Sequence, residues 1–316
     1  MSSPTTSQTP ETSKLPPATR LGHIHLTVAS LDRQIPFYTR VLGFKLHWCT
    51  GGEAALGSGS EVLLRLTEET RAHRVQRATG MYHFALLYPS RKELARALAR
   101  LFALRYPNAP TDHGVSKTTY LDDLEGNNIE LYVRSLDDAR FEMVAGEVIV
   151  RYADGRIGNG RDRLDIEALF RELGPDDPLD LPLSEGTRIG HVHLYAASLQ
   201  PMMRFYRDVL GFQEGPLWDQ FRMGEVGLDT QQPHVIAFNT WKGPGLPAAP
   251  IQALGMRYFT IVLPDVDDLQ RTLARVQAAG MSAEPTPQGT LVRDPSHIGM
   301  ILTDQMFPLS ELGGVH

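Results

Sequence analysis

The chain has very little cysteine: Cys49 is the only one among 316 residues. A single cysteine rules out an intramolecular disulfide framework and is typical of a reducing compartment, so we expect a cytoplasmic protein. No apolar run is long enough to span a bilayer, and the first residues lack the apolar core of a secretory signal. Those residues are rich in Ser, Thr and Pro, which predicts a disordered tail over residues 1–20.

An excess of positive charge is also missing. The chain has 31 Lys and Arg against 37 Asp and Glu, a formal net charge of −6. This balance argues against a nucleic acid or an anionic membrane as the partner. Hydrophobic residues at 42% and charged residues at 22% are ordinary for a globular protein, and the length predicts about two domains.

One stretch of the sequence occurs twice. Residues 21–44 read LGHIHLTVASLDRQIPFYTRVLGF, residues 189–212 read IGHVHLYAASLQPMMRFYRDVLGF, and 13 of the 24 aligned positions are identical. Each copy begins with the alternation of a β-strand and continues with a helix that ends at a glycine. Two histidines share one face of each strand, because side chains two residues apart point the same way. These histidines are His23 and His25 in the first copy, and His191 and His193 in the second.

Two further stretches, which begin at Met81 and Met256, follow the same order of strand, helix and strands. We therefore predict an α+β fold of four β-α-β-β-β units, paired into two modules. The connector between the modules contains one short helix candidate, LDIEALFREL. The expected boundaries are a disordered tail (1–20), an N-terminal module (21–134), a connector (135–187), a C-terminal module (188–303) and a C-terminal tail (304–316).

The segments GHIHLTVASL, YHFALL, YLDDLEGNNIELY, GHVHL and FNTW together resemble the vicinal oxygen chelate superfamily of glyoxalases, bleomycin-resistance proteins and extradiol dioxygenases. They are most similar to the two-module ring-cleaving dioxygenases of the catechol 2,3-dioxygenase type. The resemblance covers residues 21–303. It implies that pairs of units curl into half-barrels around a divalent metal.

The resemblance also implies a set of metal ligands. In extradiol dioxygenases these are a His on the first strand of one unit, a His on the first strand of the next, and a Glu on that unit's last strand. Carried over to this chain, they are His23, His83 and Glu130, all in the N-terminal module. His25 shares its face with His23 and is the alternative to it.

His113 and Tyr120 match the positions of a histidine and a tyrosine that line the family's active site. An imidazole titrates near neutral pH, so His113 could act as an acid or a base. Tyr120 could donate a hydrogen bond to a ligand oxygen or to the substrate. The resemblance therefore implies catalytic roles for both residues.

The C-terminal module departs from this pattern. It keeps His191 at the first ligand position but has Tyr258 and Ile301 at the other two. His234 is a candidate substitute, although no carboxylate stands at the expected place. We expect a structural or pocket-covering role for this module. The histidines 191, 193 and 234 would then form a second or vestigial metal site or line an apolar cavity.

The function that we expect is extradiol cleavage of a small catechol-like aromatic diol by O₂. Two histidines and one carboxylate leave three adjacent positions open on Fe(II), and Mn(II) suits the same ligands. One alternative is a glyoxalase- or epimerase-like metalloenzyme, which usually adds a fourth ligand on a unit's last strand. Another is a non-catalytic binding protein of the bleomycin-resistance kind, which typically lacks the three ligands. Because half-barrels with exposed strand edges tend to pair, we also expect a homo-oligomer.

Overall fold

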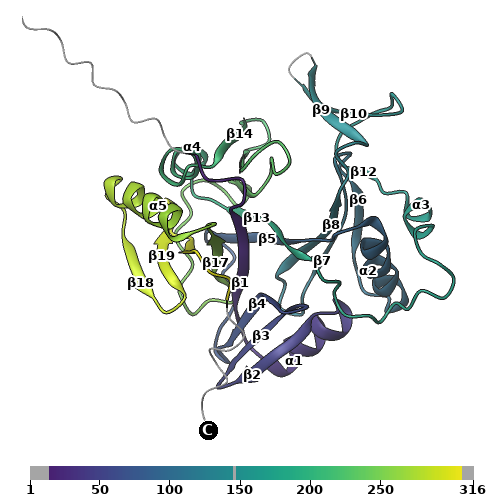
Figure 1. Cartoon of the computed structure of the whole chain (residues 1–316), viewed down its shortest axis with the longest axis horizontal. Coiled ribbons are helices and arrows are strands. Elements are labelled where there is room, and N and C mark those ends of the chain that lie inside the picture. Colours follow the sequence, from purple (N-terminus) through teal and green to yellow (C-terminus); the bar gives the residue numbers. More distant parts are fainter. Residues whose placement is uncertain (1–13, 145–146, 308–316) are drawn as a thin grey trace, which may run out of the picture.

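The computed structural model describes residues 14–144 and 147–307, and it confirms an α+β fold of four β-α-β-β-β units (Figure 1). Most of the two expected tails, residues 1–13 and 308–316, lies outside the described residues. The expected disorder does not extend to residues 14–19. Leu15 is part of the hydrophobic core, and its N–H donates to the carbonyl of Gly211.

The four units share one order of elements. Unit 1 consists of β1 (Arg20–Val28), α1 (Leu31–Pro36), the π-helical turn η1 (Phe37–Val41), β2 (Lys45–Thr50), β3 (Glu53–Ser58) and β4 (Glu61–Glu68). Unit 2 consists of β5 (Gly80–Leu87), α2 (Arg91–Ala103), β6 (Ala109–Asp112), β7 (Ser116–Asp122) and β8 (Asn128–Arg134). Unit 3 consists of β13 (Arg188–Tyr195), α4 (Leu199–Arg204), the π-helical turn η2 (Phe205–Leu210), β14 (Gln213–Trp218), β15 (Met223–Gly227) and β16 (Ile236–Asn239). Unit 4 consists of β17 (Gly255–Val262), α5 (Val266–Ala278), β18 (Ala283–Thr286), β19 (Gly289–Arg293) and β20 (Gly299–Thr303).

The connector between units 2 and 3 has more structure than its composition indicates. Its helix α3 (Ile166–Phe170) lies where the sequence predicts it and packs against α2. The connector also forms β9 (Ala139–Val144), β10 (Glu147–Tyr152), β11 (Ile157–Gly158) and β12 (Asp162–Arg163). The first three form a small sheet whose β9–β10 hairpin projects from the body of the protein (Figure 1). Across the described ranges, no helix has the length and apolar character needed to cross a membrane.

The units combine into sheets in an order that the sequence did not indicate. Units 1 and 4 form an eight-stranded sheet, here called sheet A, because β1 pairs antiparallel with β17. Units 2 and 3, with β12, form a nine-stranded sheet, here called sheet B, because β5 pairs antiparallel with β13. The expected pairing within the ranges 21–134 and 188–303 is therefore corrected: neighbouring units 1 and 2 lie in different sheets.

Strand alternation determines which side chains face each site. In β1, Ile24 and Leu26 are fully buried in the hydrophobic core, and His23 and His25, which alternate with them, point to the opposite face of the sheet. Within every unit, the first strand runs parallel to the last one. A polar residue on the last strand can therefore lie beside a histidine on the first.

Two buried hydrogen bonds join units that do not share a sheet. The Tyr38 hydroxyl donates to Asp123 Oδ2 at 2.8 Å and ties unit 1 to unit 2. The Tyr206 hydroxyl donates to Asp294 Oδ2 at 2.9 Å and ties unit 3 to unit 4. Burial raises the pKa of Asp294 to about 7, although hydrogen bonds from Ile298 N–H and from Tyr206 oppose the shift. The pKa of Asp294 is therefore higher in the folded protein than its unfolded value of 3.8. The stability that the neutral carboxyl group contributes is lost as the pH rises from 3.8 towards about 7.

We expect Tyr206→Phe to lower the free energy of unfolding by about 1–3 kcal/mol, because it removes a donor from a buried carboxyl group. Without this donor the pKa of Asp294 rises further, so the loss should be larger at pH 8 than at pH 6. Denaturant titrations at the two pH values measure both effects. Tyr106→Phe is the matched control, since its hydroxyl bonds the exposed Asp122 carbonyl. Equal losses in the two variants would contradict the interpretation.

Candidate metal centre

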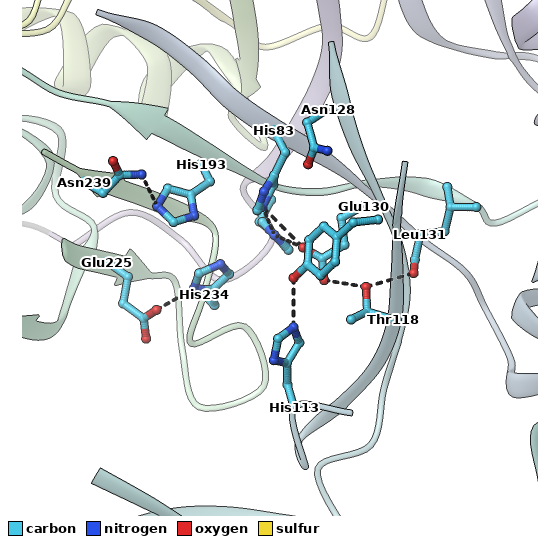
Figure 2. Close-up of polar contacts among 12 residues, drawn as sticks. His83, His113, Thr118, Asn128, Glu130, Leu131, His193, Glu225, His234 and Asn239 are labelled. Carbon is cyan, nitrogen blue, oxygen red and sulfur yellow. Dashed lines mark hydrogen bonds and ion pairs between the residues drawn. The ribbon is translucent and has the colours of Figure 1, made fainter. Parts of the chain in front are cut away.

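Three adjacent strands of sheet B present one polar group each to a common point. β5 lies between β8, which runs parallel to it, and β13, which runs antiparallel. His83 comes from β5, Glu130 from β8 and His191 from β13, and each is at least 95% buried. Figure 2 shows His83 and Glu130 turned towards one another. Strand pairing thus collects three residues that are far apart in the sequence.

The three potential ligand atoms lie close together. His83 Nε2 is 3.1 Å from His191 Nε2, and Glu130 Oε2 is 3.0 Å from His191 Nε2 and 3.3 Å from His83 Nε2. Ligands at about 2.1 Å from a metal and at right angles to one another are about 3.0 Å apart. The three atoms therefore have the spacing of one face of an octahedron, and the group could bind a metal.

The protonation states also suit a cation. Burial lowers the pKa of His83 to about 3 and lowers the pKa of His191. Burial alone would raise the pKa of Glu130, but the attraction and hydrogen bond of His191, together with His83, more than offset it, so this pKa lies below its usual range. Two neutral imidazoles and one carboxylate therefore face each other at neutral pH, which is the state that binds a divalent metal.

Neighbouring groups support this arrangement. The Thr118 hydroxyl donates to Glu130 Oε1 at 2.9 Å, which leaves Oε2 directed at the histidines. Nδ1 of His83 and Nδ1 of His191 are buried without a hydrogen-bond partner in the described part of the chain. Because the two Nε2 atoms face each other, only one of them can hold a proton as donor to the other. A metal would accept both Nε2 lone pairs.

Among residues 14–144 and 147–307, no fourth protein ligand reaches this point. In unit 2, Ala85 lies opposite Glu130, and in unit 3, His193 lies opposite Ala237. His83 comes two residues before Ala85, and His191 comes two residues before His193. Ala237 is therefore the counterpart of Glu130 in unit 3. Within the described residues, the group of potential ligands around this point has three members. The remaining positions on a bound metal would be free for small molecules.

His113 and Tyr120, to which the resemblance assigns catalytic roles, lie beside this group. Tyr120 is opposite Glu130 in the β7–β8 pairing, and its hydroxyl is 2.8 Å from His113 Nε2. His113 Nδ1 is hydrogen-bonded to the Gly160 carbonyl. A carbonyl only accepts, so Nδ1 carries the proton, and Nε2 of the neutral ring accepts from Tyr120.

A second histidine with a defined partner lies on the other side of the group. The His234 ring is 4.4 Å from the His191 ring, and its Nδ1 is 2.5 Å from Glu225 Oε2. Figure 2 shows this pair and the neighbouring His193–Asn239 pair. Burial alone would lower the pKa of His234, but the charge and hydrogen bond of Glu225 more than offset it and raise this pKa. Glu225 therefore favours the protonated form of His234 beside the candidate metal centre.

Aromatic rings form a wall beside His83. The Tyr82 ring lies 4.9 Å from the His83 ring, 5.0 Å from His193 and 5.2 Å from Trp241. His193 is itself held by Asn239 Nδ2 at 2.9 Å. These rings offer a flat apolar surface directly beside His83, one of the three potential ligands.

The structure does not bring His23 to this group. His23 lies on β1 of sheet A, where its ring packs edge-on against Tyr258 at 5.8 Å and Phe307 at 5.3 Å. His191 takes the place expected for His23, because β5 pairs with the first strand of unit 3 and not with that of unit 1. His25 is also in sheet A, bonded to Thr67.

The sequence contained a signal for His191, which stands at the same place in the repeat as His23. The repeat gives both histidines the same strand face. It does not say which copy lies beside β5. Our interpretation of His191 as part of a vestigial site followed from assuming that neighbouring units pair.

Comparison with known proteins identifies the family. The model of the Glyoxalase/Bleomycin resistance protein/Dioxygenase superfamily matches residues 20–131 and 188–298. The chain belongs to this superfamily. It is also 37% identical over 280 residues to a catechol-2,3-dioxygenase of Bacillus subtilis, covering 88% of this chain and 94% of the relative. This similarity supports an enzyme of the dioxygenase kind.

Solved structures of the superfamily share the fold. A Bacillus subtilis protein described as a candidate dioxygenase superimposes with a TM-score of 0.61 at 13% identity, over 95% of this chain and 88% of that one. Glyoxalase I from Zea mays superimposes with a TM-score of 0.54 at 17% identity, over 90% of this chain and 92% of that one. At these identities the likeness concerns the fold alone.

We expect Glu130→Gln to reduce the affinity for a divalent metal by at least about a hundredfold, because the only charged ligand is lost. His23→Gln is the matched control: it changes the buried histidine of sheet A that stands at the place of His191 in the repeat, and it should leave one metal per chain. Metal content after loading with Fe(II) or Mn(II) and gel filtration measures both. Loss of metal in His23→Gln with retention in His191→Gln would instead support the ligand set implied by the resemblance.

Proposed function

We propose that the protein is a metal-dependent extradiol dioxygenase that cleaves a catechol-like aromatic diol with O₂. The observation that carries the proposal is the three-membered group of His83, His191 and Glu130, in which Ala237 stands where a fourth ligand would be. Fe(II), or Mn(II), bound there would hold the diol and O₂ side by side and pass electron density between them. A glyoxalase-type centre would use a fourth protein ligand.

The surrounding residues suit an aromatic substrate. The wall of Tyr82, Trp241 and His193 would contact the ring of a bound diol, since aromatic rings favour offset and edge-to-face contacts. Glu130 contributes a single negative charge, so a divalent cation held here keeps a net positive charge. A singly deprotonated diol would therefore still be attracted.

Two histidines on opposite sides of the group would move protons. His113 Nε2 accepts from the Tyr120 hydroxyl, so this pair can take up a proton from a bound diol through the tyrosine oxygen. The Nδ1–H of His234 donates to Glu225. When the ring is protonated, its Nε2–H can give a proton to an oxygen atom of the substrate during ring opening. The separation gives one side a base and the other side an acid.

The test of the proposal is oxygen uptake by protein purified without air and loaded with Fe(II). With a panel of catechol, 4-methylcatechol and protocatechuate, we expect diol-dependent uptake and a yellow ring-opened product. Glu130→Gln should abolish uptake, and His23→Gln should retain it. Stoichiometric metal without oxygen uptake from any diol would count against the proposal and favour the glyoxalase- or epimerase-like alternative.

His234→Gln should lower kcat by about a hundredfold or more with little change in KM, because it removes an acid and not a binding contact. In the unaltered enzyme, activity should fall as pH rises through the pKa of His234. Glu225→Gln removes the partner that raises this pKa, so the fall should move to lower pH. Profiles of kcat against pH measure the shift. An unchanged profile in Glu225→Gln would contradict the role of His234.

A further inference from the structure

A large cavity lies beside the candidate metal centre, and Tyr82, whose ring is 4.9 Å from the His83 ring, is among its lining residues. Its volume is about 970 Å³, within the range of about 300–1,000 Å³ for small-molecule sites. Its inner wall includes His25 of β1, Arg65 of β4 and Tyr258 of β17, all from sheet A. The lining includes none of His83, Glu130 and His191 of sheet B.

Arg65 occupies in unit 1 the position that Glu130 occupies in unit 2. β1 runs parallel to β4 with His25 opposite Arg65, and β5 runs parallel to β8 with Ala85 opposite Glu130. In both units a buried histidine comes two residues before the first member of the pair. The carboxylate of one sheet is thus replaced by a guanidinium in the other, and the charge at this position is reversed.

Arg65 and His25 are buried but only partly paired. Arg65 is 5% exposed, and it donates from Nη1 to the Tyr258 hydroxyl and from Nη2 to Glu53 Oε2, both at 3.1 Å. Its Nε has no hydrogen-bond partner among the described residues. His25 is 4% exposed, and its Nδ1 likewise lacks a partner there. Buried polar atoms without partners cost free energy that a bound ligand would recover.

The cavity has a concentrated positive charge. Its cationic lining residues are Arg65, Arg74, Lys242, Arg257 and Arg293, and Glu53 is the only carboxylate among the described lining residues. Five positive charges against one negative give +4, in a chain whose net charge is −6. Burial, followed by repulsion from Arg65, lowers the pKa of His25, and burial, followed by repulsion from Arg74, lowers the pKa of Lys242. The field in the cavity therefore favours an anion.

Part of the cavity lining is apolar and consists of Met81, Leu246, Leu254, Met256 and Ile298. We propose that this cavity is a binding site for an organic anion, with its acidic group on Arg65 and Arg257 and its apolar body against these apolar side chains. A planar guanidinium matches a carboxylate or a phosphate through two parallel hydrogen bonds. The cavity shares Tyr82 with the aromatic wall of the candidate metal centre but none of the three candidate ligands, and the proposal does not depend on the oxygen chemistry.

Calorimetric titration of the full-length chain tests the proposal with three probes: 3-phenylpropanoate, phenyl phosphate and the neutral 3-phenylpropanamide. We expect one site per chain for at least one of the acids, bound about tenfold or more tightly than the amide. A preference between the two acids identifies the acidic group. Equal affinity for acid and amide, or no binding of either acid at millimolar concentration, would overturn the proposal.

Variants locate the site. Arg257 is half-buried and makes no ion pair in the described part of the chain, so Arg257→Gln should fold normally and weaken acid binding about tenfold. Arg33→Gln, at an exposed position on α1, is the matched control and should bind as the unaltered protein does. Glu130→Gln should also bind normally, which separates this site from ligation of a metal by the acid. Unchanged affinity in Arg257→Gln, or lost affinity in Glu130→Gln, would contradict the location.

Discussion

The antiparallel pairing of β5 with β13 is the constraint on which the candidate metal centre depends. It places Phe84 opposite Val192, which puts the Nε2 atoms of His83 and His191 at 3.1 Å. A slip by one residue would turn one histidine into the hydrophobic core, because strand side chains alternate between faces. The parallel pairing of β8 with β5 then adds the carboxylate of Glu130. Long-range strand register, and not any local motif, assembles the three groups.

This dependence explains what could be predicted from the sequence. Alternation and turn chemistry are local, and they identified four units and the faces of their strands. His83 and Glu130 were carried over from the family resemblance, and because they belong to one unit, the pairing of its first strand with its last strand brings them together. The third member lies 108 residues from His83 along the chain. Two copies of the same motif, around His23 and His191, satisfied every local requirement equally, and only the pairing of sheets distinguishes them.

The two sheets show how one topology can support opposite electrostatics. A position on the last strand of a unit, beside a buried histidine, holds Glu130 in unit 2, Arg65 in unit 1 and Ala237 in unit 3. The strand pairing itself does not determine the side chain at this position. The side chain needs only to be stable in a buried, polar environment. Glu130 is stabilised there by Thr118 and the histidines, and Arg65 by Glu53 and Tyr258. The charge at this position can therefore change without a change of fold.

The tolerance for such divergence follows from how the units are joined. Strand pairing joins unit 1 to unit 4 and unit 2 to unit 3, and the Tyr38–Asp123 and Tyr206–Asp294 hydrogen bonds join unit 1 to unit 2 and unit 3 to unit 4. Every unit is thus connected to both of its neighbours in a closed ring. These connections are backbone pairings between strands and two tyrosine–aspartate hydrogen bonds, so the side chains of His83, Glu130, His191 and Arg65 are not part of them. Ligand-facing side chains in one sheet can therefore be exchanged while the strand pairing, and with it the geometry of the other sheet, is kept.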